Sequence, residues 1–165
     1  MSGITLRAAN LADPADCQLL MQLTDAYARD AMGGGEGLSA QARQHLPAAL
    51  GRHPGLFALI AERDGEAVGH ALCVLGFSSF YAAPVCNLHD LSVLPAARGL
   101  GLGKALLQAV EQAAALRGCA KVTLEVRADN HVGRQLYLGQ GFAESGLGGT
   151  PYQMMEKRLP TAQKA

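Results

Sequence analysis

The feature that most constrains the fold is a glycine-rich run, Arg98-Gly99-Leu100-Gly101-Leu102-Gly103-Lys104, which we call the glycine loop. An apolar run over residues 88–94 precedes it and predicts a strand, and an apolar stripe over residues 102–117 predicts an amphipathic helix. Glycines let the backbone turn tightly and direct successive N–H groups at one anion, and the helix start adds partial positive charge. The run therefore predicts a strand–loop–helix unit with a site for a pyrophosphate group at the start of the helix.

The rest of the chain predicts strands and helices in a regular order. Asp13 before Pro14, Ser39 and Asn130 are typical helix N-caps, and Asp64-Gly65 is typical of a hairpin turn. The expected strands are residues 4–8, 56–62, 66–77, 85–94, 121–127 and 152–159. The expected helices are residues 13–31, 39–51 (with Pro47 bending or shortening it), 102–117 and 130–140. The order β-α-α-β-β-β-α-β-α-β predicts an α/β fold, a mixed sheet with helices on both faces.

Composition narrows the class of protein. We expect one domain over residues 1–160 and a frayed tail over residues 161–165. The 14 basic and 14 acidic residues cancel, which argues against nucleic acid or an anionic membrane surface as a partner. The start of the chain lacks the apolar core of a signal peptide, so we expect a cytoplasmic protein. The four cysteines form no Cys-x-x-Cys pair, so we expect no metal.

Three interpretations of the glycine loop can be compared with the positions of its glycines and of the strands before it. A Walker A loop is excluded, because Ala105 follows Lys104 where a Ser or Thr is required, and Arg98 stands in place of the first glycine. A dinucleotide-binding loop needs Gly-x-Gly-x-x-Gly directly after the first strand, whereas three strands precede this one. That reading stays open because Glu125 falls where a ribose-binding acid is expected. A helix entry without any ligand also stays open.

Two motifs resemble the GNAT superfamily of N-acetyltransferases. The acetyl-CoA loop of that family has Gln or Arg, two residues, Gly, one residue, then Gly or Ala, and Arg98, Gly101 and Gly103 fill it. Residues 124–142 resemble its second signature, in which a strand ends near an Asn (Asn130), a short helix carries a Tyr (Tyr137), and Gly-Phe follows. The nearest resemblance is to the polyamine and thialysine acetyltransferase branch. The resemblance implies the GNAT fold, acetyl-CoA as co-substrate and a homodimer, with the final strand as a possible interface.

The resemblance also implies which residues hold acetyl-CoA. They are Leu91, Ser92, Val93, Arg98, Gly99, Leu100, Gly101, Leu102, Gly103, Lys104, Asn130, Arg134 and Tyr137. Leu91 N–H is the expected oxyanion donor, and Tyr137 is the expected acid. A phenol with a pKa of about 10 stays protonated at neutral pH and can give its proton to a departing thiolate. The alternative for Tyr137 is an aromatic side chain that packs its helix on the sheet.

The general base is expected among His89, Asp90 and Glu125. The related branch has an adjacent Glu-Asp pair, and its Glu matches His89. An imidazole with a pKa of about 6.5 is a plausible base, directly or through a water, but the lost carboxylate weakens attraction for a polycationic amine. Strand alternation places His89 and Leu91 on one face and Asp90 on the other. Structural roles for His89 at a strand edge and for Asp90 as a hydrogen-bond acceptor stay open.

Acceptor contacts are expected from two irregular stretches, residues 25–37 and 78–84. Within them, the charge and ring of Asp30, Glu36 and Tyr81 suit a small primary amine. A solvated helix face would explain Asp30 equally well. The predicted function is transfer of an acetyl group from acetyl-CoA to a small-molecule amine by direct attack in a ternary complex. Two alternatives remain, acetylation of a peptide or protein amine and a non-catalytic acyl-CoA-binding sensor.

Overall fold

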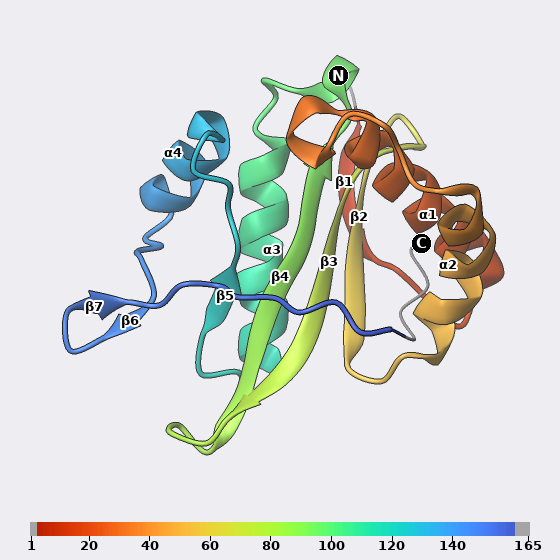
Figure 1. Cartoon of the computed structure of the whole chain (residues 1–165). Helices are drawn as coiled ribbons and strands as arrows, with labels where there is room; N and C mark the ends of the chain where they lie inside the picture. The colour runs from red at the N-terminus through yellow and green to blue at the C-terminus, as the bar shows by residue number, and fades with distance from the viewer. Residues whose placement is uncertain (1–2, 161–165) are drawn as a thin grey trace.

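A twisted five-stranded sheet organises the protein (Figure 1), and the computed structural model describes residues 3–160. The spatial order is β1-β2-β3-β4-β5. The strands are β1 (Ile4–Ala8), β2 (Leu56–Arg63), β3 (Glu66–Ser78), β4 (Ala83–Val93) and β5 (Val122–Leu124). β1 to β4 pair antiparallel, and β5 pairs parallel to β4. The sheet is therefore mixed, as the sequence predicted.

Within residues 3–160, four α-helices lie around this sheet: α1 (Pro14–Arg29), α2 (Ala40–Arg52), α3 (Leu102–Leu116) and α4 (His131–Gly139). The predicted caps are confirmed, because the side chains of Asp13, Ser39 and Asn130 accept backbone N–H groups in the first turns of α1, α2 and α4. α2 continues through Pro47 and is not shortened there. Two 3-10 turns, η1 (Ala31–Gly33) and η2 (Pro95–Ala97), follow α1 and precede the glycine loop.

The two faces of the sheet bury separate cores. Alternate residues of β2 show this division, because Ala58 and Ile60 pack with Leu20 of α1, whereas Leu59 packs with Leu106 of α3. α1 and α2 therefore cover one face and α3 covers the other. Burial of large apolar side chains on both faces is the main stabilising contribution to this arrangement.

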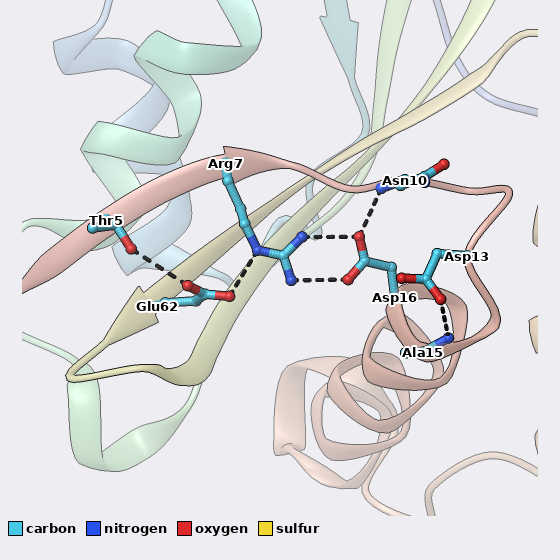
Figure 2. Close-up of polar contacts among 7 residues, drawn as sticks. All are labelled: Thr5, Arg7, Asn10, Asp13, Ala15, Asp16 and Glu62. Carbon is cyan, nitrogen blue, oxygen red and sulfur yellow. Dashed lines mark hydrogen bonds and ion pairs between the residues drawn. The ribbon is translucent and has the colours of Figure 1, made fainter.

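A polar cluster fixes the start of α1 to the edge of the sheet (Figure 2). The Arg7 guanidinium donates two hydrogen bonds of 2.8 Å to Asp16 and one of 2.7 Å to Glu62. Asp16 is only 6% exposed and also accepts the backbone N–H of Asn10 at 2.7 Å. These bonds hold the pKa of Asp16 below its usual value, chiefly through the bond from Arg7. Charged groups this buried are stable only when paired, so the cluster sets the position of α1.

Two predicted strands differ from the structure. The expected strand over residues 152–159 is wrong, because this stretch has no regular structure and all its side chains are exposed. Two short strands that were not predicted, β6 (Gly146–Leu147) and β7 (Thr150–Pro151), precede this stretch and pair with each other. A strand needs a neighbouring strand for its hydrogen bonds, and residues 152–159 join neither of the two sheets over residues 3–160. β5 is also shorter than expected, and the predicted frayed tail, residues 161–165, lies outside the described residues.

Over residues 3–160, no helix is both long and apolar enough to cross a membrane.

Candidate functional site

The site begins where β4 and β5 part. The two strands pair only at Cys86–Val122, Asn87–Thr123 and Leu88–Leu124. Beyond these pairs, Leu94 N–H donates to Val68 on the β3 side, whereas Val93 C=O faces the other way and accepts Arg98 Nε at 3.0 Å. Strand alternation turns the N–H and C=O of Leu91 to the same side as those of Val93. β4 thus presents backbone donors and acceptors to the gap beside β5.

A β-bulge at His89 shapes this part of β4. Asp90 pairs with Leu72 and Leu88 pairs with Cys73, so His89 is an extra residue without an opposite partner. The bulge places both Leu88 and Leu91 on the α3 side, although they are three residues apart. Asp90 lies on the α1 side. The extra residue, His89, lies beside the gap and lines it together with Leu91.

The glycine loop joins the end of β4 to the start of α3 at the upper end of the sheet in Figure 1. Gly99 and Gly101 have φ values of 79° and 77°, a conformation that glycine adopts without strain, and Gly101 is the N-cap of α3. The first N–H groups of α3 therefore point out of the loop with no capping side chain. Together with Lys104 they give the loop the positive character that a pyrophosphate needs.

A cavity of about 660 Å³, the main cavity, extends from the glycine loop between α1 and α4. Its lining includes Arg98, Lys104 and Gly101 from the loop, Ser92 from β4 and Tyr27 from α1. Asp30, a predicted acceptor residue, also lines this cavity, but its carboxylate forms an ion pair with Arg98. The hydrogen bond from Arg98 lowers the pKa of Asp30. This contact favours a role for Asp30 in ordering the loop.

A second cavity of about 320 Å³, the inner cavity, lies where β4 and β5 diverge. It is lined by His89 and Leu91 from β4, Glu125 after β5, Tyr137 from α4 and Tyr27. Tyr27 and Tyr137 line both cavities, so the main cavity leads to the inner one beside two phenol groups.

Tyr137 packs in the core and also lines the two cavities, so its position is compatible with both interpretations that the sequence left open. Its ring packs against the α3 core and lies 6.0 Å from the ring centroid of Phe142, while it also lines the two cavities. Burial, and secondarily the nearby Tyr27, raises the pKa of Tyr137. Its phenol therefore holds its proton more firmly than a phenol in water does.

The three base candidates have different surroundings. His89 is exposed and lines the inner cavity. Asp90 is half-buried, and burial raises its pKa although the charge of His89 opposes this effect. Glu125 lines the inner cavity and accepts a hydrogen bond of 3.2 Å from Asn87 Nδ2. A histidine and a carboxylate thus meet at the same cavity, where an amine could be deprotonated.

Other predicted residues lie elsewhere. Arg134 lines a third cavity of about 500 Å³ along the edge of β5, away from the glycine loop, which argues against contact with phosphates. Leu100 is 47% exposed and lines none of the three cavities. Glu36 is exposed in the loop before α2. Tyr81 lies in the β3–β4 turn, at the opposite end of β4 from the glycine loop (Figure 1), with its ring 5.5 Å from Lys121 Nζ. An acceptor role for Glu36 or Tyr81 is therefore without structural support.

The remaining predicted cofactor residues come together around the main cavity. They are Leu91, Ser92, Val93, Arg98, Gly99, Gly101, Leu102, Gly103, Lys104, Asn130 and Tyr137. The side chain of Asn130 is also bonded to Gly133 N–H at 2.9 Å, so it positions α4. Tyr27 and Met32 line both cavities, and the sequence analysis placed them in the stretch 25–37 without singling them out. Only their place near the end of α1, beside the glycines that stop it, could have indicated them.

Comparisons of sequence and of structure with known proteins both find acetyltransferases. Residues 20–142 match the model of the acetyltransferase (GNAT) family. YhfO, an uncharacterised N-acetyltransferase of Bacillus subtilis strain 168, is 36% identical over 103 residues, which cover 62% of this chain and 68% of YhfO. The aminoglycoside N(6')-acetyltransferase type 1 of Klebsiella aerogenes is 35% identical over 83 residues, 49% of this chain and 55% of that enzyme. The chain thus spans about half to two thirds of the length of these relatives. The structure of aminoglycoside N-acetyltransferase AAC(6')-Iy in complex with CoA superposes with a TM-score of 0.71, at 22% identity and 97% coverage of both chains.

Proposed function

The chain belongs to the acetyltransferase (GNAT) family and is an acetyl-CoA-dependent acetyltransferase, and we propose that its acceptor is a primary amine of a small molecule. The observation that carries the proposal is the continuity of the site. The glycine loop, the open edge of β4 and Tyr137 follow one another along connected cavities. Phosphates, an extended amide-containing arm and a reacting thioester require these features in this order. The nearer resemblance to the polyamine and thialysine branch stays a prediction.

The residues of the main cavity fit acetyl-CoA. We assign the pyrophosphate to the N–H groups after Gly101, with Arg98 and Lys104 supplying positive charge. The amides of the pantetheine arm would pair with the backbone of Leu91 and Val93, as an added strand pairs with a sheet edge. The thioester supplies an already activated acyl group, so no enzyme nucleophile is needed.

Proton transfer is assigned to groups at the inner cavity. We propose that His89, directly or through a water, removes a proton from the acceptor ammonium. Leu91 N–H is placed to stabilise the developing oxyanion. Tyr137 would donate its proton to the departing thiolate, and its raised pKa ensures that the proton is present at neutral pH.

Negative charge at the inner cavity supports an amine acceptor. Glu125 lines the same cavity as His89, and it supplies the carboxylate that position 89 lacks relative to the polyamine branch. The rings of Tyr27 and Tyr137 add faces on which a cation is stabilised. The similarity to the Klebsiella enzyme supports a small molecule with several amines.

Calorimetric titration with acetyl-CoA, followed by thiol release with a panel of acceptors, tests the proposal. The panel should contain polyamines, aminoglycosides and free amino acids, with peptides as the second arm. We expect binding of acetyl-CoA and turnover with a small amine. Turnover only with peptides would establish the alternative acceptor class, and binding without turnover would favour an acyl-CoA sensor. Absence of binding would refute the site. A single domain over residues 1–160, a cytoplasmic location and a homodimer stay predictions.

A further inference from the structure

His70 is a fully buried histidine whose two ring nitrogens both meet hydroxyl groups. It lies on β3 directly opposite Ser92 of β4 and is 0% exposed. Its Nδ1 is 2.8 Å from Ser92 Oγ, and its Nε2 is 3.4 Å from Thr24 Oγ1 of α1. The three side chains thus form a line from α1 through the sheet face to the main cavity, which Ser92 lines.

The protons along this line can be assigned from the hydrogen bonds. Thr24 donates its only hydroxyl proton to Leu20 C=O at 2.8 Å, so its oxygen can only accept from His70. Burial lowers the pKa of His70 to about 4, so the ring is neutral at pH 7 and carries one N–H. A proton on Nε2 satisfies Thr24, whereas a proton on Nδ1 would leave two lone pairs facing each other. The network therefore assigns the proton to Nε2 and leaves Nδ1 as an acceptor.

This tautomer determines what Ser92 offers to the cavity. Since Nδ1 has no proton, Ser92 must donate its own hydroxyl proton to His70. The oxygen then has only lone pairs to offer to a ligand in the main cavity, and the complementary group is a hydrogen-bond donor such as an N–H. Ser92 lies on the α1 side of β4 with Asp90, whereas Leu91 and Val93, whose backbones are assigned to the pantetheine arm, pack toward α3.

We propose that the acceptor extends from the inner cavity, where its reacting amine lies, into the main cavity, and that Ser92 is a specificity-determining residue that accepts a hydrogen bond there from a second N–H of the acceptor. His70 and Thr24 are positioning residues that keep the Ser92 hydroxyl proton turned away from the cavity. This inference rests on the proposed function. A hydroxyl free to rotate could donate to an oxygen acceptor as readily as it accepts from an amine. The fixed hydroxyl favours groups that donate a hydrogen bond, such as an amine, over carbonyl or ether oxygens, which can only accept one.

The first test compares Ser92→Ala with Ser92→Thr, which keeps the hydroxyl. We expect Ser92→Ala to raise the KM of the amine about five- to fiftyfold, the effect of one lost hydrogen bond to an amine or ammonium group. The Kd of acetyl-CoA from calorimetry should change less than about twofold, which also verifies folding. Ser92→Thr should restore most of the affinity. An unchanged amine KM would overturn the proposal, and so would a rise in the acetyl-CoA Kd alone, which would assign Ser92 to a pantetheine amide.

The second test separates positioning from simple packing. Thr24→Val removes the acceptor of the Nε2 proton at nearly constant volume, and Thr24→Ser is the matched control that keeps it. Nitrogen NMR of the His70 ring should show a proton on Nε2 in the wild type and in Thr24→Ser, and on Nδ1 in Thr24→Val. The amine KM should rise only in Thr24→Val. A proton on Nδ1 in the wild type would refute the assignment whatever the kinetics.

Failure of the proposed function has a different signature. The wild type would then release no thiol with any amine, which would overturn both conclusions together. Failure of the Ser92 assignment alone would leave normal wild-type turnover and an amine KM that Ser92→Ala does not change.

Discussion

Buried His70 predicts a specific dependence of folding stability on pH. Its pKa falls from 6.5 to about 4 in the folded protein because burial disfavours the charged ring. Between these pH values the unfolded chain binds a proton at this site and the folded chain does not, so stability rises with pH. The contribution is fully present above pH 6.5 and is lost as pH falls toward 4. Since a tenfold change in proton affinity is worth about 1.4 kcal/mol, the complete loss is about 3 kcal/mol, with about 2 kcal/mol lost by pH 5.

Urea unfolding at pH 7.5 and at pH 5, followed by circular dichroism, measures this loss. His70→Gln is the matched variant, because an amide can donate and accept as neutral imidazole does but cannot take up a proton. Asp90 opposes the effect, since burial raises its pKa and protonation then stabilises the folded state as pH falls. The difference between wild type and variant removes such contributions. If that difference were the same at both pH values, the reasoning about His70 would be refuted.

Three further predictions follow from the fold and the site. Arg7→Met should lower the free energy of unfolding by about 3 kcal/mol, because it leaves buried Asp16 without its cation, whereas Thr5→Ala should change it by less than about 0.5 kcal/mol. Equal effects in urea unfolding would contradict this. Gly101→Asp should raise the Kd of acetyl-CoA at least about tenfold over Gly101→Asn, because both residues tolerate positive φ and only Asp repels the pyrophosphate; equal Kd values in calorimetry would remove the phosphates from this loop. Tyr137→Phe should lower kcat about a hundredfold and leave the acetyl-CoA Kd nearly unchanged, and an unchanged kcat would exclude the phenol from proton transfer.

Local signals predicted most of the fold. Asp13, Ser39 and Asn130 occupy the cap positions that their side chains favour, and the Asp64-Gly65 turn has both residues at positive φ. The glycine loop combined such a signal with a family motif, and it marks the main cavity. These features depend on residues that are adjacent in the sequence, so they can be recognised from the sequence alone.

Features that depend on distant partners were not predictable. The line of Thr24, His70 and Ser92 joins three elements, and nothing near His70 in the sequence indicates that both of its ring nitrogens meet hydroxyl groups. The contact of Arg98 with Asp30 likewise spans 68 residues and changes the reading of Asp30. The strand expected over residues 152–159 is absent, because a strand requires an available neighbouring edge, and the local sequence does not report whether one exists.

The short pairing of β4 with β5 has a consequence for how the molecule unfolds. Three residue pairs connect β5 laterally to the rest of the sheet, and the gap above them is the assigned place of the pantetheine arm. A ligand lying there would contact both strands and supply a lateral connection that the polypeptide omits. At a hundred times its Kd it adds about 2.7 kcal/mol to global stability. In the free protein, β5 and α4 should open as a separate cooperative unit with fast amide exchange, and the ligand should merge this unit with the rest of the domain.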